Sequence, residues 1–514
     1  MDRHGTESYY IVGEGLLDAT RGGRALALAQ AAPPFFFSRM GPSGVNRQLQ
    51  EAGARKVGDA MVAEPGSAGP IPAGFTYLGQ FVDHDLTFDK TNVMLGENVT
   101  PAMLVQARSP SLDLDSLYGG GPDDPESAKF YEADGIHLKV GTTDAIGGIP
   151  AKSGFDLPRG AGTTADQKRK AIIPDPRNDE NLAVAQTHLA FIRFHNRVVD
   201  TLDPTIPMGQ RFAKARRLVV LHYQWMLRTD YLPRICANGV VNAVFKNGRK
   251  AFEVGASPMA TPTMPIEFSV AAFRLGHSMI RAEYNWNKEF DAGAGTLGLL
   301  FTFSGGSGDF FGGPRLPSNW IADFRRLYEF TEAGRNDLDV PIAKFNRAMR
   351  IDTSLVDPLA TLPGFPAGEN NLAFRNLTRA KMVKLATGQQ MVTSLKQKGV
   401  TPLTKLTNAQ IRDGNGGADL SSLTQAQRTK LLQDTPLWFY ILREAEFNSG
   451  RLKGVGARIV AETFHRAIEG STFSIVRNKA WRPSLGPNDE TFRMVDLLLF
   501  AFEGQKALLN PLGD

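Results

Sequence analysis

The 514-residue sequence contains a single cysteine, Cys236. An intramolecular disulfide is therefore excluded, and no pair of thiolates exists to hold zinc or an iron–sulfur cluster. We interpret the chain as a protein of a reducing compartment, or as an exported protein that does without disulfides.

The sequence also lacks long apolar runs and any block of basic residues. No run of 18 apolar residues occurs, so we expect no membrane span. The net charge of +5 comes from Lys and Arg scattered through the chain, unlike the clustered pattern of nucleic-acid-binding proteins. The N-terminal sequence MDRHGTESYYIVGEG has no hydrophobic segment and no cleavage site, so no secretory signal is indicated. A cytoplasmic location and export without such a signal both stay open, as does the oligomeric state.

Helical periodicity covers most of the chain, whereas strand signals are sparse. With 42% apolar residues, the chain is long enough for a large buried core. We predict a mainly α protein, a single large helical domain with few short strands, packed around something internal. Residues 1–70 are rich in Gly, Pro and Ala and are predicted to form an arm wrapped on the body formed by residues 71–514.

The stretch from Phe75 to Asp89 predicts a helix with two different faces. Asp85 falls near right angles to His84, so these neighbours point at two different places. Burying polar side chains without hydrogen-bond partners costs free energy, so the rest of the chain must supply partners for the polar face. The apolar stripe consists of Phe75, Leu78, Val82 and Leu86, and the opposite face carries Gln80, Asp83, His84 and Thr87.

The segment from Ser109 to Asp124 alternates and ends in three glycines, so it is not predicted to be helical. Ser109, Ser111, Asp113 and Asp115 lie on one side of it at a spacing of two. Hydroxyl and carboxylate oxygens suit a hard cation such as Ca²⁺, which takes 6–8 oxygen ligands. A solvated turn is the alternative, but the nearby carboxylate of Asp85 favours the cation.

Two further helices are predicted to carry polar pairs. A long helix begins after Pro176, with Arg177 and Glu180 on one face, either meeting a common ligand or forming a first-turn salt bridge. A second helix covers residues 269–284 and places Arg274 and His277 on one face, with Gly276 allowing something flat to approach the backbone. A core histidine that donates to a carbonyl is the alternative for His277.

Two helical histidines without cysteine partners suggest haem more than zinc. Zinc requires three or four ligands at short spacing, and the sequence has no HExxH or similar set. For haem, one histidine suffices as the axial ligand, and the second can act as an acid and base.

These segments resemble the motifs of the animal-type haem peroxidase superfamily, the group of myeloperoxidase and lactoperoxidase. GQFVDHD at 79–85 resembles its distal-histidine motif, and AFRLGHSMI at 272–280 resembles its proximal-histidine motif. The sequence from Arg177 resembles the catalytic-arginine helix, and RTDYLP at 228–233 also fits. The motifs occur in the family's order. The family's disulfides are missing, which fits a bacterial-type member.

The resemblance implies a haem b site and a calcium site in the body of the chain, which would then be the catalytic domain. His84 would be the distal acid and base, with Arg177 beside it and Gln80 lining the pocket. His277 would ligate the iron, with Asn376 accepting from its other ring nitrogen. Arg274 and Arg379 would neutralise the haem propionates. The calcium ligands would be Asp85, Ser109, Ser111 through its carbonyl, Asp113 and Asp115.

Asp83 and Glu180 match carboxylates that form ester links to haem in the mammalian members. Hydrogen bonding without a covalent link stays open for both. Asn181 stands where myeloperoxidase-like members have a methionine, so no sulfonium link is expected.

The implied activity is reduction of hydrogen peroxide through an oxidised-iron intermediate, with oxidation of a halide, pseudohalide or small organic donor. A haem-dependent fatty-acid dioxygenase of the same superfamily is one alternative. Its radical tyrosine stands three residues before the proximal histidine, where this chain has Arg274. A non-catalytic haem-binding protein is the other alternative, although it has no need for His84 and Arg177 together.

Overall fold

The computed structural model describes residues 35–63, 66–91, 93, 95–362 and 365–514. Within these ranges most regular structure is helical, and the strands form two-stranded sheets only. The prediction of a mainly α protein with few short strands is therefore confirmed.

The helices differ widely in length. The longer ones are α1 (Glu51–Val62), α2 (Gly74–Leu86), α5 (Leu182–Asp200), α6 (Met208–Met226), α8 (Asn238–Asn247), α12 (Leu372–Met382), α13 (Gly388–Gln397), α15 (Gln425–Gln433), α16 (Leu437–Glu446), α17 (Gly454–Gly470) and α18 (Met494–Ala501). The short ones are α3 (Asp115–Tyr118), α4 (Ala165–Arg169), α7 (Leu232–Ile235), α9 (Ile266–Ser269), α10 (Gly276–Met279), α11 (Leu297–Thr302), α14 (Asn408–Asp413) and α19 (Lys506–Leu509).

The strands are short and pair across the molecule. One pair is parallel, β1 (Phe37–Ser38) with β5 (Met264–Pro265). The antiparallel pairs are β2 (Ala68–Pro72) with β8 (Arg347–Met349), β3 (Gly141–Thr142) with β4 (Ser153–Asp156), and β6 (Glu283–Tyr284) with β7 (Gly295–Thr296).

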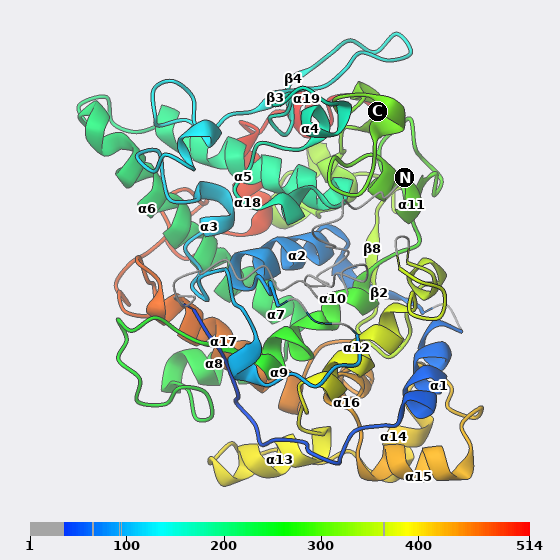
Figure 1. Cartoon of the computed structure of the whole chain (residues 1–514). Coiled ribbons are helices and arrows are strands. Elements are labelled where there is room, and N and C mark those ends of the chain that lie inside the picture. Colours follow the sequence, from blue (N-terminus) through cyan, green and yellow to red (C-terminus); the bar gives the residue numbers. More distant parts are fainter. Residues whose placement is uncertain (1–34, 64–65, 92, 94, 363–364) are drawn as a thin grey trace.

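Helix α2 crosses the middle of the molecule and packs against α5 on one side and α10 on the other (Figure 1). Its apolar stripe is fully buried, and Phe81 stacks on Phe191 of α5 with ring centroids 4.4 Å apart. A Cβ at Gly79 would lie 2.4 Å from the hydroxyl of Tyr231, so only glycine permits this close approach. The helix predicted from Phe75 to Asp89 is thus the central element of the core.

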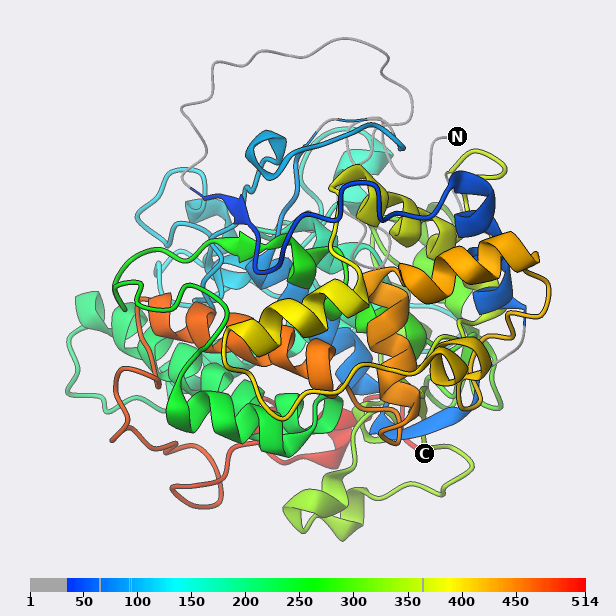
Figure 2. The same cartoon turned by 90° about the horizontal axis from the view of Figure 1, so that it is seen from below.

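Helices α13, α16 and α17 pack together in the lower part of the molecule, as the view from below shows (Figure 2). Trp438 of α16 donates its indole N–H to the carbonyl of Arg274, 3.3 Å away. Its ring centroid lies 6.3 Å from that of His277. This group of helices therefore supports the segment that carries His277.

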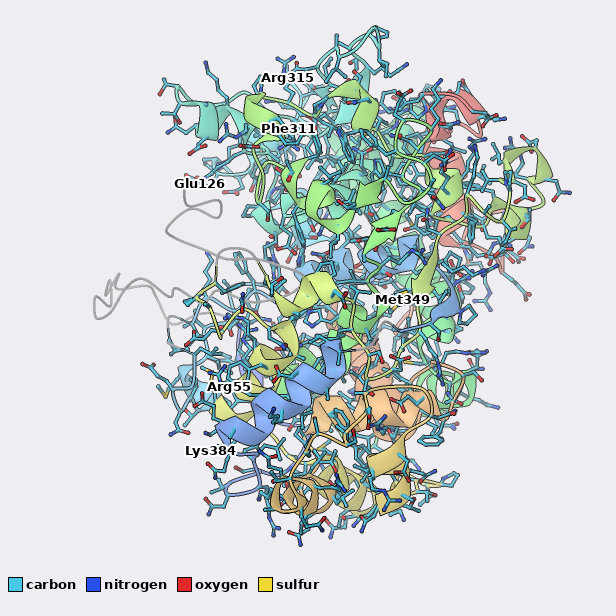
Figure 3. The ribbon with its side chains drawn as sticks, turned by 90° about the vertical axis from the view of Figure 1, so that its right-hand side faces the viewer. Arg55, Glu126, Phe311, Arg315, Met349 and Lys384 are labelled. Carbon is cyan, nitrogen blue, oxygen red and sulfur yellow. The ribbon has the colours of Figure 1, made fainter. Side chains whose placement is uncertain are left out.

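The predicted N-terminal arm is described from residue 35 onward, and residues 1–34 lie outside the described residues. Helix α1 packs along α12, with the Arg55 guanidinium 4.0 Å above the Phe374 ring. Figure 3 labels Arg55 on α1 and Lys384 just beyond α12. The domain division at residue 70 stays a prediction.

Several helix predictions need correction. The helix expected from Arg177 begins only at Leu182, because Asn181 caps α5 by accepting from the Val184 N–H at 2.9 Å. Residues Pro176–Asp179 instead form a 3₁₀ turn. The helical periodicity expected over most of the chain also does not hold between residues 318 and 360, which contain 3₁₀ turns and β8.

The single helix expected over 269–284 is broken into α9, a 3₁₀ turn at Ala272–Leu275, α10 and β6. Arg274 donates its Nε–H to the carbonyl of Ser269 at 3.0 Å, which satisfies an acceptor left open where α9 ends. The break therefore places Arg274 and His277 after the end of α9, with Arg274 held by the last residue of that helix.

None of the helices described by the structure is long and apolar enough to cross a bilayer.

Candidate haem site

His84 is buried completely near the C-terminal end of α2. Its Nδ1 lies 2.8 Å from Oδ1 of Asn178, and because an amide oxygen only accepts, this orientation of Asn178 places the ring proton on Nδ1. Its Nε2 has no hydrogen-bond partner among the described residues, and Oε1 of Glu180 is 3.7 Å away. Burial, and then the positive charge of Arg177, lower the pKa of His84 to about 3. The imidazole is therefore neutral, with a lone pair on Nε2.

Arg177 is held beside His84 by a buried ion pair. Its Nε and Nη2 donate to Oδ1 and Oδ2 of Asp175 at 3.0 and 2.7 Å, and Nη2 also donates to the carbonyl of His84 at 2.8 Å. Arg108 donates to the same carboxylate at 2.5 Å. Burial by itself would raise the pKa of Asp175, but Arg177 and Arg108 outweigh it and hold this pKa well below its usual value. Asp175 therefore fixes the position of Arg177 relative to His84.

We expect Asp175→Ala to lower the free energy of unfolding by about 3–5 kcal/mol, because two arginines would stay buried without their shared carboxylate. The depressed pKa means that Asp175 stabilises the fold above the unfolded pKa of about 4 and loses this effect as the pH falls through the folded pKa. Urea unfolding at pH 7 and at acidic pH measures both effects. As a control, Asp413→Ala removes an exposed carboxylate and should leave the unfolding midpoint unchanged; equal midpoints for the two variants would contradict the prediction.

Gln80 links the helix to the carboxylate of Glu180. Its amide N–H donates to Glu180, and its carbonyl accepts from Asn181 at 3.0 Å. Asp83 is half-buried and accepts from the hydroxyl of Thr87 at 3.2 Å. Burial raises the pKa of Asp83, against the opposing charges of Arg274 and Arg177.

Gln80, Asp83, Gly276 and His277 line one cavity. A Cβ added at Gly276 would meet no atom within 4 Å, so open space lies beside His277. A second cavity is lined by residues that include Arg177, Arg274 and Arg379. Arg274 borders both cavities, so the two adjoin and bring together the arginines expected at the site.

The amide of Asn376 contacts His277, as the resemblance implies, but with the opposite polarity. Its Nδ2 lies 2.8 Å from Nδ1 of His277, while its Oδ1 accepts from Arg274 at 3.4 Å. In this orientation Asn376 donates to the ring. Turning the amide by 180° exchanges Oδ1 and Nδ2, and then Asn376 accepts from Nδ1–H and leaves the Nε2 lone pair for a metal.

The expected calcium residues are only partly brought together. Asp85 is buried and accepts from the backbone N–H groups of Leu114 and Ser116 at 3.2 and 3.3 Å. Burial, followed by the negative charge of Asp115, raises the pKa of Asp85 to about 7. Burial likewise raises the pKa of Asp113 to about 6, although Asp113 accepts from the Thr472 N–H.

The two serines and Asp115 do not complete a coordination shell. The hydroxyl of Ser111 donates to the carbonyl of Gly470 at 3.5 Å, Ser109 is half-buried, and Asp115 pairs with Arg216 at 3.5 Å. In the part of the chain that the structure describes, no three His, Cys, Asp or Glu side chains are arranged to hold a metal ion.

Sequence reasoning missed Asp175 and Asn178, which hold Arg177 and His84. Both stand next to residues that were singled out, and an Asp before Pro is a signal for the start of a helical turn. His188 of α5 is also buried, and neither of its ring nitrogens has a hydrogen-bond partner among the described residues.

The donor set fits a haem. An unpartnered imidazole nitrogen on α2, open space beside a second histidine and arginines at the adjoining cavity match a flat group bearing carboxylates. Together with the mainly helical fold, these features are those expected of a helical haem-binding protein.

Comparisons with known proteins agree. The family model described as animal haem peroxidase matches residues 70–299. The chain is 26% identical to thyroid peroxidase of Rattus norvegicus over 175 residues, which cover 33% of this chain and 19% of that protein. It is 31% identical to a peroxidase-like protein of Margaritifera margaritifera over 111 residues, 21% of this chain and 14% of that protein. The matches thus span a fifth or less of these relatives.

Solved structures share the fold over most of the chain. Peroxidase A of Dictyostelium discoideum superposes with a TM-score of 0.56 at 15% identity, covering 92% of this chain and 94% of that chain. The fatty acid alpha-dioxygenase of Oryza sativa superposes with a TM-score of 0.50 at 10% identity, covering 87% and 76%. Residues 70–299 are thus similar to the animal haem peroxidase family, as the motifs of the sequence indicated.

Proposed function

We propose that this protein is a haem peroxidase that reduces hydrogen peroxide and oxidises a halide, pseudohalide or small organic donor. One observation carries the proposal. The buried, neutral imidazole of His84 has its Nδ1 held by Asn178, its Nε2 makes no hydrogen bond to a described residue, and Arg177 is fixed beside it. A protein that only stored haem would have no use for such a base.

In this proposal His277 would hold the iron, and Arg274 and Arg379 would pair with the haem carboxylates. Haem, when bound, supplies the iron at which the O–O bond of peroxide is cleaved. His84 accepts a proton on Nε2 from one peroxide oxygen and returns it to the other, so that water leaves. Arg177 stabilises the negative charge that develops on the departing oxygen. The donor supplies two electrons for each peroxide reduced.

The proposal is tested with the purified, haem-loaded protein. Peroxide should drive oxidation of iodide, thiocyanate or a phenol, and no oxygen should be consumed when an unsaturated fatty acid is added. A protein that binds haem but oxidises none of these donors would contradict the proposal and leave the non-catalytic alternative.

A fatty-acid dioxygenase is the second candidate, because the fold is also that of the Oryza sativa enzyme. Arg274 stands where the dioxygenases carry their radical tyrosine, which favours the peroxidase. Oxygen uptake with the fatty acid would reverse this preference.

We further propose that Asp83 and Glu180 form ester links to haem. Each carboxylic acid and a haem methyl group would give an ester, with hydrogen peroxide taking up the two electrons and leaving as two waters. After peroxide treatment, acidic solvent should leave haem on the wild-type chain and release unmodified haem from an Asp83→Asn, Glu180→Gln variant. Mass analysis distinguishes the two outcomes. Release of unmodified haem from the treated wild type would contradict the ester links.

A calcium ion at Asp85, Ser109, Ser111, Asp113 and Asp115 completes the proposed site. A cation would offset the repulsion among carboxylates whose pKa values burial already raises. We expect removal of calcium by a chelator, or Asp85→Ala, to lower haem retention and peroxidase activity together, because Asp85 adjoins His84 on α2. Asp123→Ala, on the same loop but exposed, is the control. Unchanged activity in Asp85→Ala would show that calcium does not position His84.

A further inference from the structure

A large cavity away from the haem site is lined by residues of α8, of α17 and of the end of α6. Helices α8 and α17 pack side by side, on the left of Figure 1. The volume of the cavity is about 740 Å³, within the range of small-molecule sites. The segment 475–490 forms its remaining wall. It shares no lining residue with the cavities that border His277 and Arg177.

Positive side chains dominate this cavity. Arg228, Lys246, Lys479 and Arg482 line it, against two carboxylates, those of Glu469 and Glu490. Glu469 already pairs with Arg249 at 2.7 Å, and Glu490 is exposed. No hydrogen bond or ion pair joins the side chains of Arg228, Lys246 or Lys479 to any residue that the structure describes. The cavity therefore gathers three cations that pair with no carboxylate among the described residues.

Aromatic rings orient the two arginines. The Arg228 guanidinium lies 5.3 Å from the ring centroid of Phe245 and 6.0 Å from that of Trp225. Arg482 lies 5.8 Å from the Trp225 ring. These distances are those of cation–π contacts, which leave the N–H groups of Arg228 for a ligand, in the fork that matches carboxylate and phosphate groups. Arg482 donates from one of its terminal nitrogens to the carbonyls of Lys479 and Trp481.

The electrostatic potential inside the cavity is positive. Burial, and then the charges of Arg249, Lys479 and Arg228, lower the pKa of the lining residue His465 to about 3. His465 thus stays neutral, with Arg249 2.8 Å from its Nδ1. An anion in the cavity would be attracted by several charges at once.

The wall of the cavity is held in place by one buried amide. Gln224, next to Trp225, donates to the carbonyls of Leu112 and Phe473 at 3.0 and 2.7 Å. Its own oxygen accepts from the Ile475 N–H at 3.2 Å. The segment that carries Lys479 and Arg482 is therefore fixed to α6, as a preorganised binding site requires.

We propose that this cavity binds a small polyanion that carries phosphate or carboxylate groups. Several unneutralised cations around one volume of this size suit a ligand with two or more oxyanion groups, which Arg and Lys recognise through charge-assisted hydrogen bonds. The site is separate from the haem cavities, so its occupation does not depend on peroxidase activity.

Titration calorimetry of the full chain with inorganic tripolyphosphate, and separately with citrate, tests this. We expect one of the two to bind, and Lys246→Ala with Lys479→Ala to weaken that binding by about tenfold or more, since each loses a charge-assisted contact. Arg228→Gln should weaken it similarly, with its thermal midpoint recorded to verify folding. Lys214→Ala, an exposed lysine of α6 outside the cavity, is the matched control and should bind like the wild type.

The two ligands distinguish the source of the oxyanion groups. Binding of tripolyphosphate alone assigns the site to phosphorylated molecules, and binding of citrate alone assigns it to polycarboxylates. Both ligands can also chelate a metal cation bound to the protein. A calorimetric signal that came from such chelation would be the same in the wild type and in the cavity variants. Absence of binding by both ligands, or equal affinity in the wild type and the double lysine variant, would overturn the proposal.

Discussion

Replacing His84 by Ala should lower peroxide-dependent turnover of the haem-loaded protein by about 10²–10⁴-fold, the usual contribution of a positioned acid and base. The reason lies in the two ring nitrogens. Asn178 holds the proton on Nδ1, so Nε2 is the atom that can accept a proton, and Nε2 makes no hydrogen bond to a described residue. The low pKa of His84 keeps that nitrogen unprotonated at neutral pH. Steady-state kcat/KM for hydrogen peroxide with a phenolic donor measures the effect.

Two controls separate chemistry from folding in this experiment. His84→Ala should retain haem, as its absorption spectrum would report, because the proposed iron ligand is untouched. His137→Gln replaces a partly exposed histidine that pairs with Asp134 and Asp200 at the surface, and it should turn over like the wild type. Full activity of His84→Ala would rule out its role as the proton carrier.

Replacing His277 by Gly should abolish stable haem binding, and added imidazole should restore part of it. His277 borders the cavity that also contains Gln80 and Asp83, with open space at Gly276 beside it. A free imidazole can occupy the volume of the missing side chain and supply the same nitrogen. Haem titration followed by absorption, with and without imidazole, measures this result.

Asn376→Ala provides a graded comparison. Loss of an outer partner of a metal-bound histidine commonly costs 10–100-fold in metal affinity or activity, less than loss of the ligand itself. The variant should therefore bind haem more weakly than the wild type and more tightly than His277→Gly. Wild-type haem affinity in His277→Gly without imidazole would exclude His277 as the iron ligand.

The local character of α2 could be predicted from its sequence. The apolar residues at helical spacing predicted a helix, and Gly74–Leu86 is one, with Phe75, Leu78, Val82 and Leu86 buried. The perpendicular directions of His84 and Asp85 follow from the same 100° step between residues. In the structure His84 contacts the side chain of Asn178, whereas Asp85 accepts from the backbone N–H groups of Leu114 and Ser116.

Segment ends near the site were less predictable. Arg177 was expected on the first turn of α5, but Asn181 competes for the backbone N–H groups and starts the helix later. The segment before His277 was expected to be one helix, yet contacts with Trp438 and Ser269 hold Arg274 where the helix is broken. These contacts come from packing, which residue spacing does not encode.

The sequence by itself determined the helical class, the two-faced helix of residues 75–89 and the motifs by which the family is recognised, because these depend on residue types at short spacing. Only the tertiary structure decided which nitrogen of His84 is available, how Arg177 reaches the carbonyl of His84, and that cations from the turn after α6, from α8 and from the segment 475–490 surround one cavity. Each of these depends on groups distant in the chain, and a buried charge or imidazole takes its protonation state from the neighbours that folding brings to it.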